Sequence, residues 1–329
     1  MRKIAPSSGI LPASVAHFLQ HQVVLKVESA STLEGFCADL DVTDRNYRHR
    51  RISHIVKMVL AAVGQITSTA SMAHNLTQCR IVIQRAVEAG AKALFLPEAS
   101  DYIGGSPDET ISLCKPASKS PFLVGLQQDA LKHSLPISVG VHEPSDDPAS
   151  NRIKNTLLWI NEKGEITQRY QKLHMFDLEI KDGPVMKESN VIEPGRAILP
   201  PFDSPIGKIG ATICFDLRFP EFSLALKRQN AEVILYPSAF TPHTGKAHWL
   251  PLLQARAIET EAYVIAAAQV GPHNAKRTSY GHSIVIDPWG EVVAELGGEK
   301  KDEPEIILAD IDLEKVKKTR REMPLLRRT

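Results

Sequence analysis

The chain has 329 residues, which is enough to bury a substantial core in one large domain or in two of ordinary size. Its 39 basic and 38 acidic side chains leave a formal charge of +1, so the composition gives no overall attraction to nucleic acid or to an anionic membrane. Four scattered cysteines without a CxxC pair predict neither a zinc site nor a disulfide-stapled fold. The apolar runs fall short of the roughly 20 residues that cross a bilayer as a helix. We therefore expect a cytoplasmic protein with no nucleic-acid or membrane partner.

Residues 1–57 differ in composition from the rest of the chain. Glu28 is their first acidic residue, and basic residues, serines and a short apolar patch precede it, which is a weak signature of organelle import. The same composition suits an unfolded extension, because arginine is scarce before Glu28 and several aspartates follow it. We interpret the segment as an extension of a cytoplasmic protein, with mitochondrial import as the alternative.

Residues 58–312 alternate apolar strands with amphipathic helices, which is the pattern of an α/β domain whose sheet is covered by helices. We interpret them as one domain. Turn compositions at residues 161–164 and 287–290 predict hairpins between neighbouring strands. The basic tail, residues 313–329, is expected to be helical. In chain order the expected elements are a strand at 59–66, a helix at 75–88, a strand at 93–96, a helix at 122–132, strands at 136–141, 155–160, 166–170 and 208–213, a helix at 216–229, a strand at 232–236, a helix at 246–260, and strands at 263–270 and 305–311.

Four polar residues come at or just after the ends of separate predicted strands, namely Glu98, Glu143, Lys172 and Cys214. Ligand sites of open α/β sheets gather at the carboxyl ends of the strands, so these side chains are candidates for one site. Singly, each has a structural explanation. A cysteine that ends an apolar strand is usually a small core residue, and a lysine after a hairpin is usually a surface charge. The case for a site therefore depends on their combination.

The combination has a chemical rationale, because a thiol with a pKa of about 8.5 is mostly protonated at neutral pH. Glu98 can accept the proton of Cys214, and Lys172 can stabilise both the thiolate and the oxyanion that forms when the thiolate attacks an amide carbonyl. The backbone N–H of Phe215 is a candidate second donor to that oxyanion. We expect Glu143 to orient Lys172 or the substrate.

Three segments around these residues resemble the signature blocks of the nitrilase, or carbon-nitrogen hydrolase, superfamily: residues 95–99 (FLPEA), 170–174 (YQKLH) and 213–221 (ICFDLRFPE). The resemblance extends from about Val59 to Asp312. It implies a four-layer αββα sandwich and a catalytic triad of Glu98, Lys172 and Cys214, with Glu143 as an auxiliary glutamate. It also implies that no metal or organic cofactor is needed and that the protein forms homodimers or larger homo-oligomers.

Five further segments, residues 188–190, 237–240, 247–249, 256–260 and 276–283, resemble the deaminated-glutathione amidase branch of this superfamily more than its omega-amidase branch. That branch implies hydrolysis of deaminated glutathione to 2-oxoglutarate and cysteinylglycine through a thioester on the cysteine. A substrate with several carboxylates needs cationic contacts.

Arg218, close to the nucleophile in sequence, is a candidate for such a contact. A structural ion pair between Arg218 and Glu221 is the alternative.

Other functions remain open from the sequence. The same triad would serve an omega-amidase acting on 2-oxoglutaramate, a nitrilase or an N-carbamoyl amidohydrolase. A metal hydrolase is suggested by six histidines, but they show no HExxH or HxH spacing. A binding protein that keeps the fold without activity is a third class, against which the intact triad argues. The histidines are His142, His174, His243, His248, His273 and His282.

Overall fold

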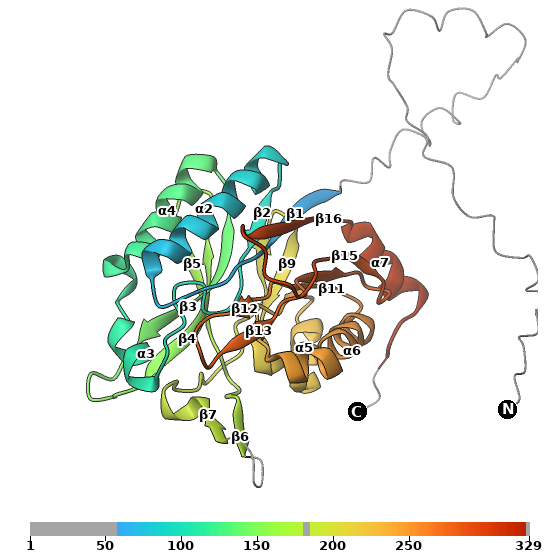
Figure 1. The fold of residues 1–329 in the computed structure, drawn as a ribbon. Helices are drawn as coiled ribbons and strands as arrows, with labels where there is room; N and C mark the ends of the chain where they lie inside the picture. The colour runs from blue at the N-terminus through green and yellow to red at the C-terminus, as the bar shows by residue number, and fades with distance from the viewer. Residues whose placement is uncertain (1–57, 180–184, 327–329) are drawn as a thin grey trace, which may run out of the picture. The chain divides into compact units, whose positions relative to one another are not determined.

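The computed structural model of the chain describes residues 58–179 and 185–326. The predicted N-terminal extension, and with it the prediction of a targeting role, lies outside the described residues. Two six-stranded sheets dominate the described part of the chain, and four helices cover their outer faces (Figure 1). No described helix is long and apolar enough to cross a membrane.

The first sheet is built on a parallel centre with antiparallel strands added on both sides. Strands β1, β2 and β3 run parallel, while β16 pairs with β1 and β4 pairs with β3 in antiparallel register. Helices α2 and α4 pack against each other and against one face of this sheet (Figure 1). In order across the sheet the strands are β16 (Glu305–Ile311), β1 (Val59–Gln65), β2 (Ala93–Phe95), β3 (Ile137–Pro144), β4 (Ile153–Ile160) and β5 (Ile166–Gln171); the helices are α2 (Met72–Glu88) and α4 (Pro121–His133).

The second sheet repeats this arrangement. Strands β9, β10 and β11 run parallel at its centre, and antiparallel strands flank them. Helices α5 and α6 cover the face of this sheet that lies away from the first sheet (Figure 1). In order across the sheet the strands are β15 (Val292–Glu295), β14 (Ile284–Ile286), β11 (Tyr263–Ala266), β10 (Val233–Leu235), β9 (Gly207–Ala211) and β8 (Phe202–Ser204); the helices are α5 (Pro220–Arg228) and α6 (Pro242–Thr260).

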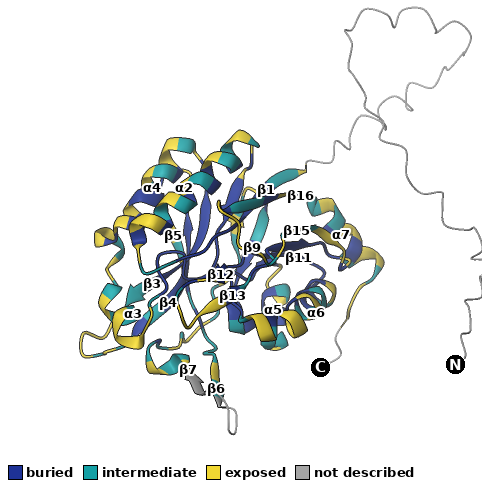
Figure 2. Cartoon of the chain, viewed as in Figure 1, coloured by how far each residue is buried: buried dark blue, intermediate teal, exposed yellow. Residues whose placement is uncertain are grey.

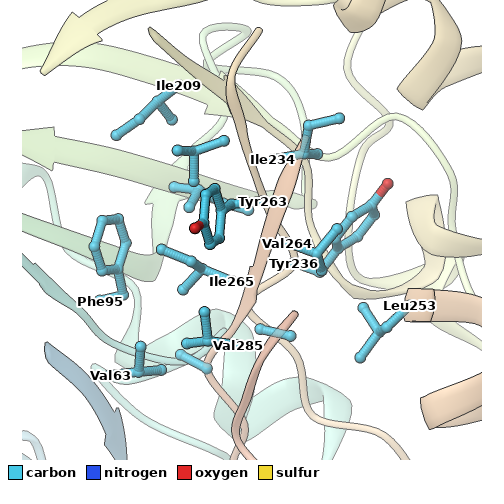
Figure 3. Packing of buried hydrophobic residues seen from close by; sticks show 14 of the residues in the cluster. Val63, Phe95, Ile209, Ile234, Tyr236, Leu253, Tyr263, Val264, Ile265 and Val285 are labelled. Carbon is cyan, nitrogen blue, oxygen red and sulfur yellow. The ribbon is translucent and has the colours of Figure 1, made fainter. Parts of the chain in front are cut away.

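The layers follow from the alternation of side chains along each strand. Successive side chains of a strand point to opposite faces, so Leu94 packs with α2 and α4 while Phe95 packs between the sheets. Figure 3 shows Phe95 facing Ile209 and Ile265 of the second sheet, and Leu253 of α6 next to the opposite face of that sheet. The centres of both sheets are buried on both faces, and exposure is greatest on the outer sides of the helices, in loops and on the edge strands β15 and β16 (Figure 2). The predicted four-layer αββα sandwich is confirmed.

Most predicted elements are present within a few residues of their predicted bounds, and two differ in kind. The helix predicted over 216–229 is divided into a 3-10 turn, η3 (Cys214–Arg218), and α5, because Pro220 occupies the first turn of a new helix. The strand predicted over 263–270 ends as β11 at Ala266. Beyond it, Gln269 forms an isolated bridge with Ile66, the residue that follows β1, so the second half of the predicted strand leaves the second sheet.

The remaining short elements lie in connections that the sequence pattern did not predict, apart from the helix of the basic tail. They are α3 (Pro107–Leu113), η1 (Ala117–Lys119), the hairpin of β6 (Asp177–Glu179) and β7 (Val185–Lys187), η2 (Glu188–Asn190), the hairpin of β12 (Val270–Pro272) and β13 (Thr278–Tyr280), and α7 (Leu313–Glu322). The helix α7 confirms the helical prediction for residues 313–322 of the tail.

Gly140 allows the segment that carries Glu98 to lie directly against β3. The Gly140 N–H donates to the carbonyl of Pro97 at 3.0 Å. A Cβ added at Gly140 would lie 2.5 Å from the Cα of Glu98 and 2.8 Å from the Pro97 oxygen, which are backbone atoms that cannot rotate away. Glycine is therefore required here for close approach of two backbones.

We predict that Gly140→Ala destabilises the fold by about 1–3 kcal/mol, as overpacking in a buried site does, and lowers turnover by displacing Glu98. Gly297→Ala is the matched control, because no atom outside Gly297 and its two chain neighbours lies within 4 Å of a Cβ built there. Urea unfolding and steady-state kinetics on both variants measure the effect. Equal stability and equal turnover in the two variants would contradict this role of Gly140.

Candidate active site

Cys214 is the first residue of η3, at a sharp turn that follows β9. Its φ is 47°, in the left-handed region that is strained for a residue with a side chain. Its backbone N–H donates to the carbonyl of Pro237 at 3.0 Å, which fixes the turn to the strand end of β10. Cys214 is buried but lines a cavity, as does the following residue, Phe215. The turn thus brings a buried thiol to the wall of a cavity.

Asp216 holds this turn against the segment that carries Lys172. Its carboxylate accepts hydrogen bonds from the Ile213 N–H at 2.9 Å and from the Tyr170 hydroxyl at 2.6 Å. It also accepts from the His174 backbone N–H at 3.1 Å and lies 2.7 Å from Nδ1 of the same residue. One buried carboxylate therefore joins the end of β5 to the cysteine turn.

Glu98 follows β2, and the chain turns at Ala99 with a φ of 53°. Its Oε1 accepts from the Lys172 Nζ at 3.0 Å and from the Asn155 Nδ2 at 2.8 Å. Its Oε2 accepts from the Ala239 N–H at 2.9 Å. The Gln269 side chain holds the Glu98 carbonyl at 2.9 Å. Glu98 is thus buried, fully hydrogen-bonded and fixed in orientation.

Lys172 lies between two carboxylates. Its Nζ donates to Glu98 Oε1 at 3.0 Å and to Glu188 Oε1 and Oε2 at 2.9 and 3.0 Å. Glu188 is itself held by the Phe176 N–H at 2.6 Å. An isolated buried ammonium is strongly unfavourable, and these two partners compensate its lost hydration.

The charges of the group are set by this pairing. Burial disfavours the ammonium of Lys172, but Glu188 and Glu98 outweigh it and raise the pKa of Lys172 well above its usual value. Burial likewise favours neutral Glu98, but the charge of Lys172 and hydrogen bonds from Cys214 and Lys172 lower the pKa of Glu98. Burial, with the nearby Glu98 charge, raises the pKa of the Cys214 thiol. The resting group is therefore a charged lysine, an ionised glutamate and a protonated thiol that is hydrogen-bonded to that glutamate.

Glu143 does not join this group, contrary to the expectation that it orients Lys172. In the β3–β4 pair, His142 lies opposite Asn155 and Glu143 opposite Lys154, so Glu143 and Asn155 point to opposite faces of the sheet. Glu143 instead pairs with Arg169 at 3.2 Å on the face covered by helices. The second glutamate at Lys172 is Glu188.

Sequence reasoning missed two residues of this group, Glu188 and Asn155. Glu188 comes from a short 3-10 turn after a small hairpin, and Asn155 lies inside β4, so neither ends a predicted strand. The available signal for Glu188 was the segment 188–190, which contributed to the family resemblance. Asn155 had no signal beyond being a polar residue in an apolar strand.

A cavity of about 720 Å³ opens over the group, within the range of small-molecule sites. Among its lining residues are Glu98, Lys172, Glu188 and Cys214. The cavity also has further cationic side chains, Lys187, Arg218, Lys276 and Arg277, and a set of neutral polar ones, Asn155, Asn190, Thr241, Thr244, Asn274 and Thr278. The cavity thus joins a nucleophile, a base and a cation to a positively charged wall.

The histidines do not converge on a metal site. His142 contacts Asp101, His174 contacts Asp216, and His282 contacts Glu295, each in a different part of the fold. Within residues 58–179 and 185–326 no group of three or more metal-binding side chains comes together.

Comparison with known proteins agrees with this site. The profile of the carbon-nitrogen hydrolase family matches residues 60–321. "Probable hydrolase nit2" of Schizosaccharomyces pombe is 48% identical over 272 residues, which cover 82% of this chain and 98% of that protein. The deaminated glutathione amidase of Homo sapiens is 44% identical over 271 residues, covering 82% of this chain and 81% of that protein. The crystal structure of the Caenorhabditis elegans NitFhit protein has a TM-score of 0.76 and 40% identity, covering 82% of this chain and 65% of that one.

The fold and the similarity together define a hydrolase of carbon-nitrogen bonds. The chain belongs to the carbon-nitrogen hydrolase family, which confirms the resemblance drawn from three sequence segments. Its activity is that of an amidase acting on bonds other than peptide bonds. The matched range contains Glu98, Lys172 and Cys214 together with Glu188 and Asn155.

Asn155 provides a test of how this group is tuned. Its Nδ2 donates to Glu98, while its Oδ1 is buried without a partner in the described part of the chain. We predict that Asn155→Leu lowers the free energy of unfolding by at most about 1.5–3 kcal/mol, because it removes a hydrogen bond to the buried Glu98 carboxylate together with an unpaired acceptor. It should lower kcat/KM by roughly 10- to 100-fold, because hydrogen bonds to charged groups contribute about 1.5–3 kcal/mol.

The same substitution should shift the acid limb of the kcat/KM profile to higher pH. Losing a donor to the carboxylate raises the pKa of Glu98, and only ionised Glu98 can accept a proton. Thr156→Val is the matched control, because Thr156 also has a buried unpaired oxygen but is not among the residues that line the cavity. An unshifted acid limb in Asn155→Leu, or an equal shift in Thr156→Val, would refute the role assigned to Asn155.

Proposed function

We propose that the protein hydrolyses the amide bond of deaminated glutathione to 2-oxoglutarate and cysteinylglycine. The main support is the charge of the cavity. Two carboxylates line it, Glu98 and Glu188, and both are bound to Lys172. Five cationic side chains line it, although the whole chain carries a formal charge of only +1. This local excess favours an amide substrate with several carboxylates, and relatives named deaminated glutathione amidase support its identity.

Arg218 is the proposed contact for the carboxylate of the acyl half. It lies four residues after the nucleophile, and its guanidinium carbon is 5.5 Å from the ring centre of Phe215 and 5.7 Å from that of Phe240. Its guanidinium nitrogens lie 3.3 Å from His248 Nδ1. Within the described residues no carboxylate pairs with Arg218, so the alternative ion pair with Glu221 is not formed. A half-buried, positioned and unneutralised guanidinium is suited to a carboxylate.

Acylation would begin with transfer of the Cys214 proton to Glu98 as the sulfur attacks the amide carbon. The oxyanion that forms would be stabilised by the charge of Lys172 and the backbone N–H of Phe215. Glu98 would then give the proton to the departing nitrogen, so that cysteinylglycine leaves as a neutral amine. The product of this step is a thioester between Cys214 and the acyl half.

Deacylation would use the same groups. Glu98, again ionised, accepts a proton from water as the water oxygen attacks the thioester carbon. Collapse of the second oxyanion breaks the carbon–sulfur bond, and the sulfur regains the proton from Glu98 while 2-oxoglutarate leaves. Glu188 keeps Lys172 charged and in place through both steps, which is the role first expected of Glu143.

We further propose that copies of the chain assemble as homodimers or larger homo-oligomers. Leu250 and Ile258 of α6 are exposed, as is Trp289 in the turn between β14 and β15. A Cβ at Gly290 would lie 2.7 Å from Ile258, so this turn and α6 form one apolar surface. Such surfaces are commonly covered by association. Light scattering on wild type and on Ile258→Asp measures the assembly; a wild-type monomer would overturn it.

The domain limits and the compartment also remain proposals. We place the hydrolase domain at residues 58–312 and the N-terminal extension at 1–57, in a cytoplasmic protein or, if the extension is an import signal, a mitochondrial one. N-terminal sequencing of the protein from its native cells tests the second case. A mature chain that begins well inside residues 1–57 would favour import over the cytoplasm.

The roles of the triad predict a clear mutational pattern. Cys214→Ala should abolish turnover and the acyl adduct that intact-protein mass spectrometry detects on wild type during hydrolysis. Glu98→Gln should retain the fold and lose both acylation and hydrolysis, as loss of general acid–base catalysis typically costs about 10²- to 10⁴-fold. Cys114→Ala removes a thiol outside the cavity lining and should leave both turnover and the acyl adduct as in wild type. Substantial turnover in Cys214→Ala would show that the nucleophile was wrongly assigned.

The substrate is tested by comparing deaminated glutathione with 2-oxoglutaramate. The two share the 2-oxo acid half and differ in the leaving group, which is cysteinylglycine or ammonia. We expect a higher kcat/KM for deaminated glutathione. A higher value for 2-oxoglutaramate would assign the protein to omega-amidase activity instead.

A further inference from the structure

The hairpin of β12 and β13 forms a fixed wall of the catalytic cavity. Its loop is closed by Asn274, whose Oδ1 accepts from the N–H groups of Lys276 and Arg277 at 2.9 and 3.0 Å. The His273 N–H donates to the Arg277 carbonyl at 2.9 Å. The backbone of both cationic residues is therefore held in one conformation, although their side chains are exposed.

The hairpin is also anchored to the segment that follows β1. His273 lies with Nδ1 2.8 Å from the Ser68 carbonyl and Nε2 2.8 Å from the Ser279 hydroxyl. Burial lowers the pKa of His273 to about 4, so the ring is neutral at physiological pH and these contacts persist. Asn274 donates to the carbonyl of Gly104 at 3.3 Å, in the loop that follows Glu98.

The charges of this wall have no carboxylate partner in the part of the chain that the structure describes. Lys276 and Arg277 line the cavity that contains Glu98 and Cys214, and neither pairs with a carboxylate among residues 58–179 and 185–326. The charge of Arg277 contributes to lowering the pKa of Glu98, after larger effects of burial and Lys172, so it acts at the reacting centre. Two adjacent cations on a rigid loop that faces a cavity form a site for an anion.

The position of this wall differs from that of Arg218. Arg218 is half-buried and packs against Phe215 and Phe240 close to the nucleophile. Lys276 and Arg277 are exposed and their hairpin contacts the loop after β2. When a thiol attacks an amide carbon, the acyl half and the leaving half extend from that carbon in different directions. A substrate with a carboxylate on each half therefore needs two separate cationic contacts.

We propose that Lys276 and Arg277 bind the carboxylate at the far end of the leaving group and so select amides of a carboxylate-bearing amine over simple carboxamides. This inference rests on the proposed function, since it assigns the leaving half of that substrate. Arg218, by contrast, binds the acyl half that both substrate classes share. The hairpin contact is made before and during acylation and is absent after cysteinylglycine leaves, so it contributes to acylation and not to hydrolysis of the thioester.

The test is a ratio of two specificity constants, kcat/KM for deaminated glutathione divided by kcat/KM for 2-oxoglutaramate. Arg277→Ala and Lys276→Ala should each lower this ratio about tenfold, the size of a lost charge-assisted hydrogen bond. Any effect of Arg277 through Glu98 acts on both substrates and cancels in the ratio. Arg218→Ala should lower both constants and leave the ratio within about twofold of wild type. Arg228→Ala, an exposed arginine outside the cavity lining, is the control for charge alone.

A second arm isolates the contact itself. Deaminated glutathione whose glycine carboxylate is replaced by a carboxamide should be a poorer substrate of wild type by at least about tenfold. This penalty should be smaller in Arg277→Ala and absent in the double variant Lys276→Ala/Arg277→Ala. If wild type hydrolyses deaminated glutathione but the ratio and the carboxamide penalty are the same in wild type and Arg277→Ala, this inference is overturned and the proposed function stands. If wild type does not hydrolyse deaminated glutathione, both are overturned.

Discussion

The arrangement of the site depends on the buried ammonium of Lys172 between the carboxylates of Glu98 and Glu188. Burial alone would disfavour the charges of Lys172 and Glu98, and their pairing with each other and with Glu188 compensates for it. Together they keep Glu98 ionised next to a protonated thiol. A base that is charged at rest, and a cation already in place where negative charge will develop, form a preorganised site for attack on an amide carbonyl.

The fold brings these groups together from distant segments. Glu98 follows a strand of the first sheet, Lys172 follows the last strand of the same sheet, and Cys214 follows a strand of the second sheet. Packing the two sheets face to face places these three strand ends at one cavity. The hydrogen bonds of Asp216 then fix the distance between the lysine segment and the cysteine turn, and Gln269 connects Glu98 to the chain beyond β11.

Much of the site could be predicted from the sequence because each triad residue ends, or closely follows, a predicted strand. Glu143 also ends such a strand, yet strand parity directs its side chain to the other face of the sheet. The sequence does show which side chains of a strand share a face, because they alternate. Which of the two faces carries the site is known only once the second sheet is in place. Glu188 comes from an irregular turn whose path depends on tertiary contacts such as the Phe176 N–H, so no local pattern could predict its contact with Lys172.

The central claim is that Glu98 takes the proton of Cys214 while Lys172 remains charged. The pH dependence of Cys214 alkylation by iodoacetamide, followed by intact-protein mass spectrometry in wild type and in Glu98→Gln, tests it most directly. We expect a wild-type rate that is already at its plateau at neutral pH, because an ionised Glu98 is the proton acceptor. In Glu98→Gln the rate should rise only at a pH above the ordinary thiol pKa of about 8.5. Identical profiles in the two proteins would contradict the account.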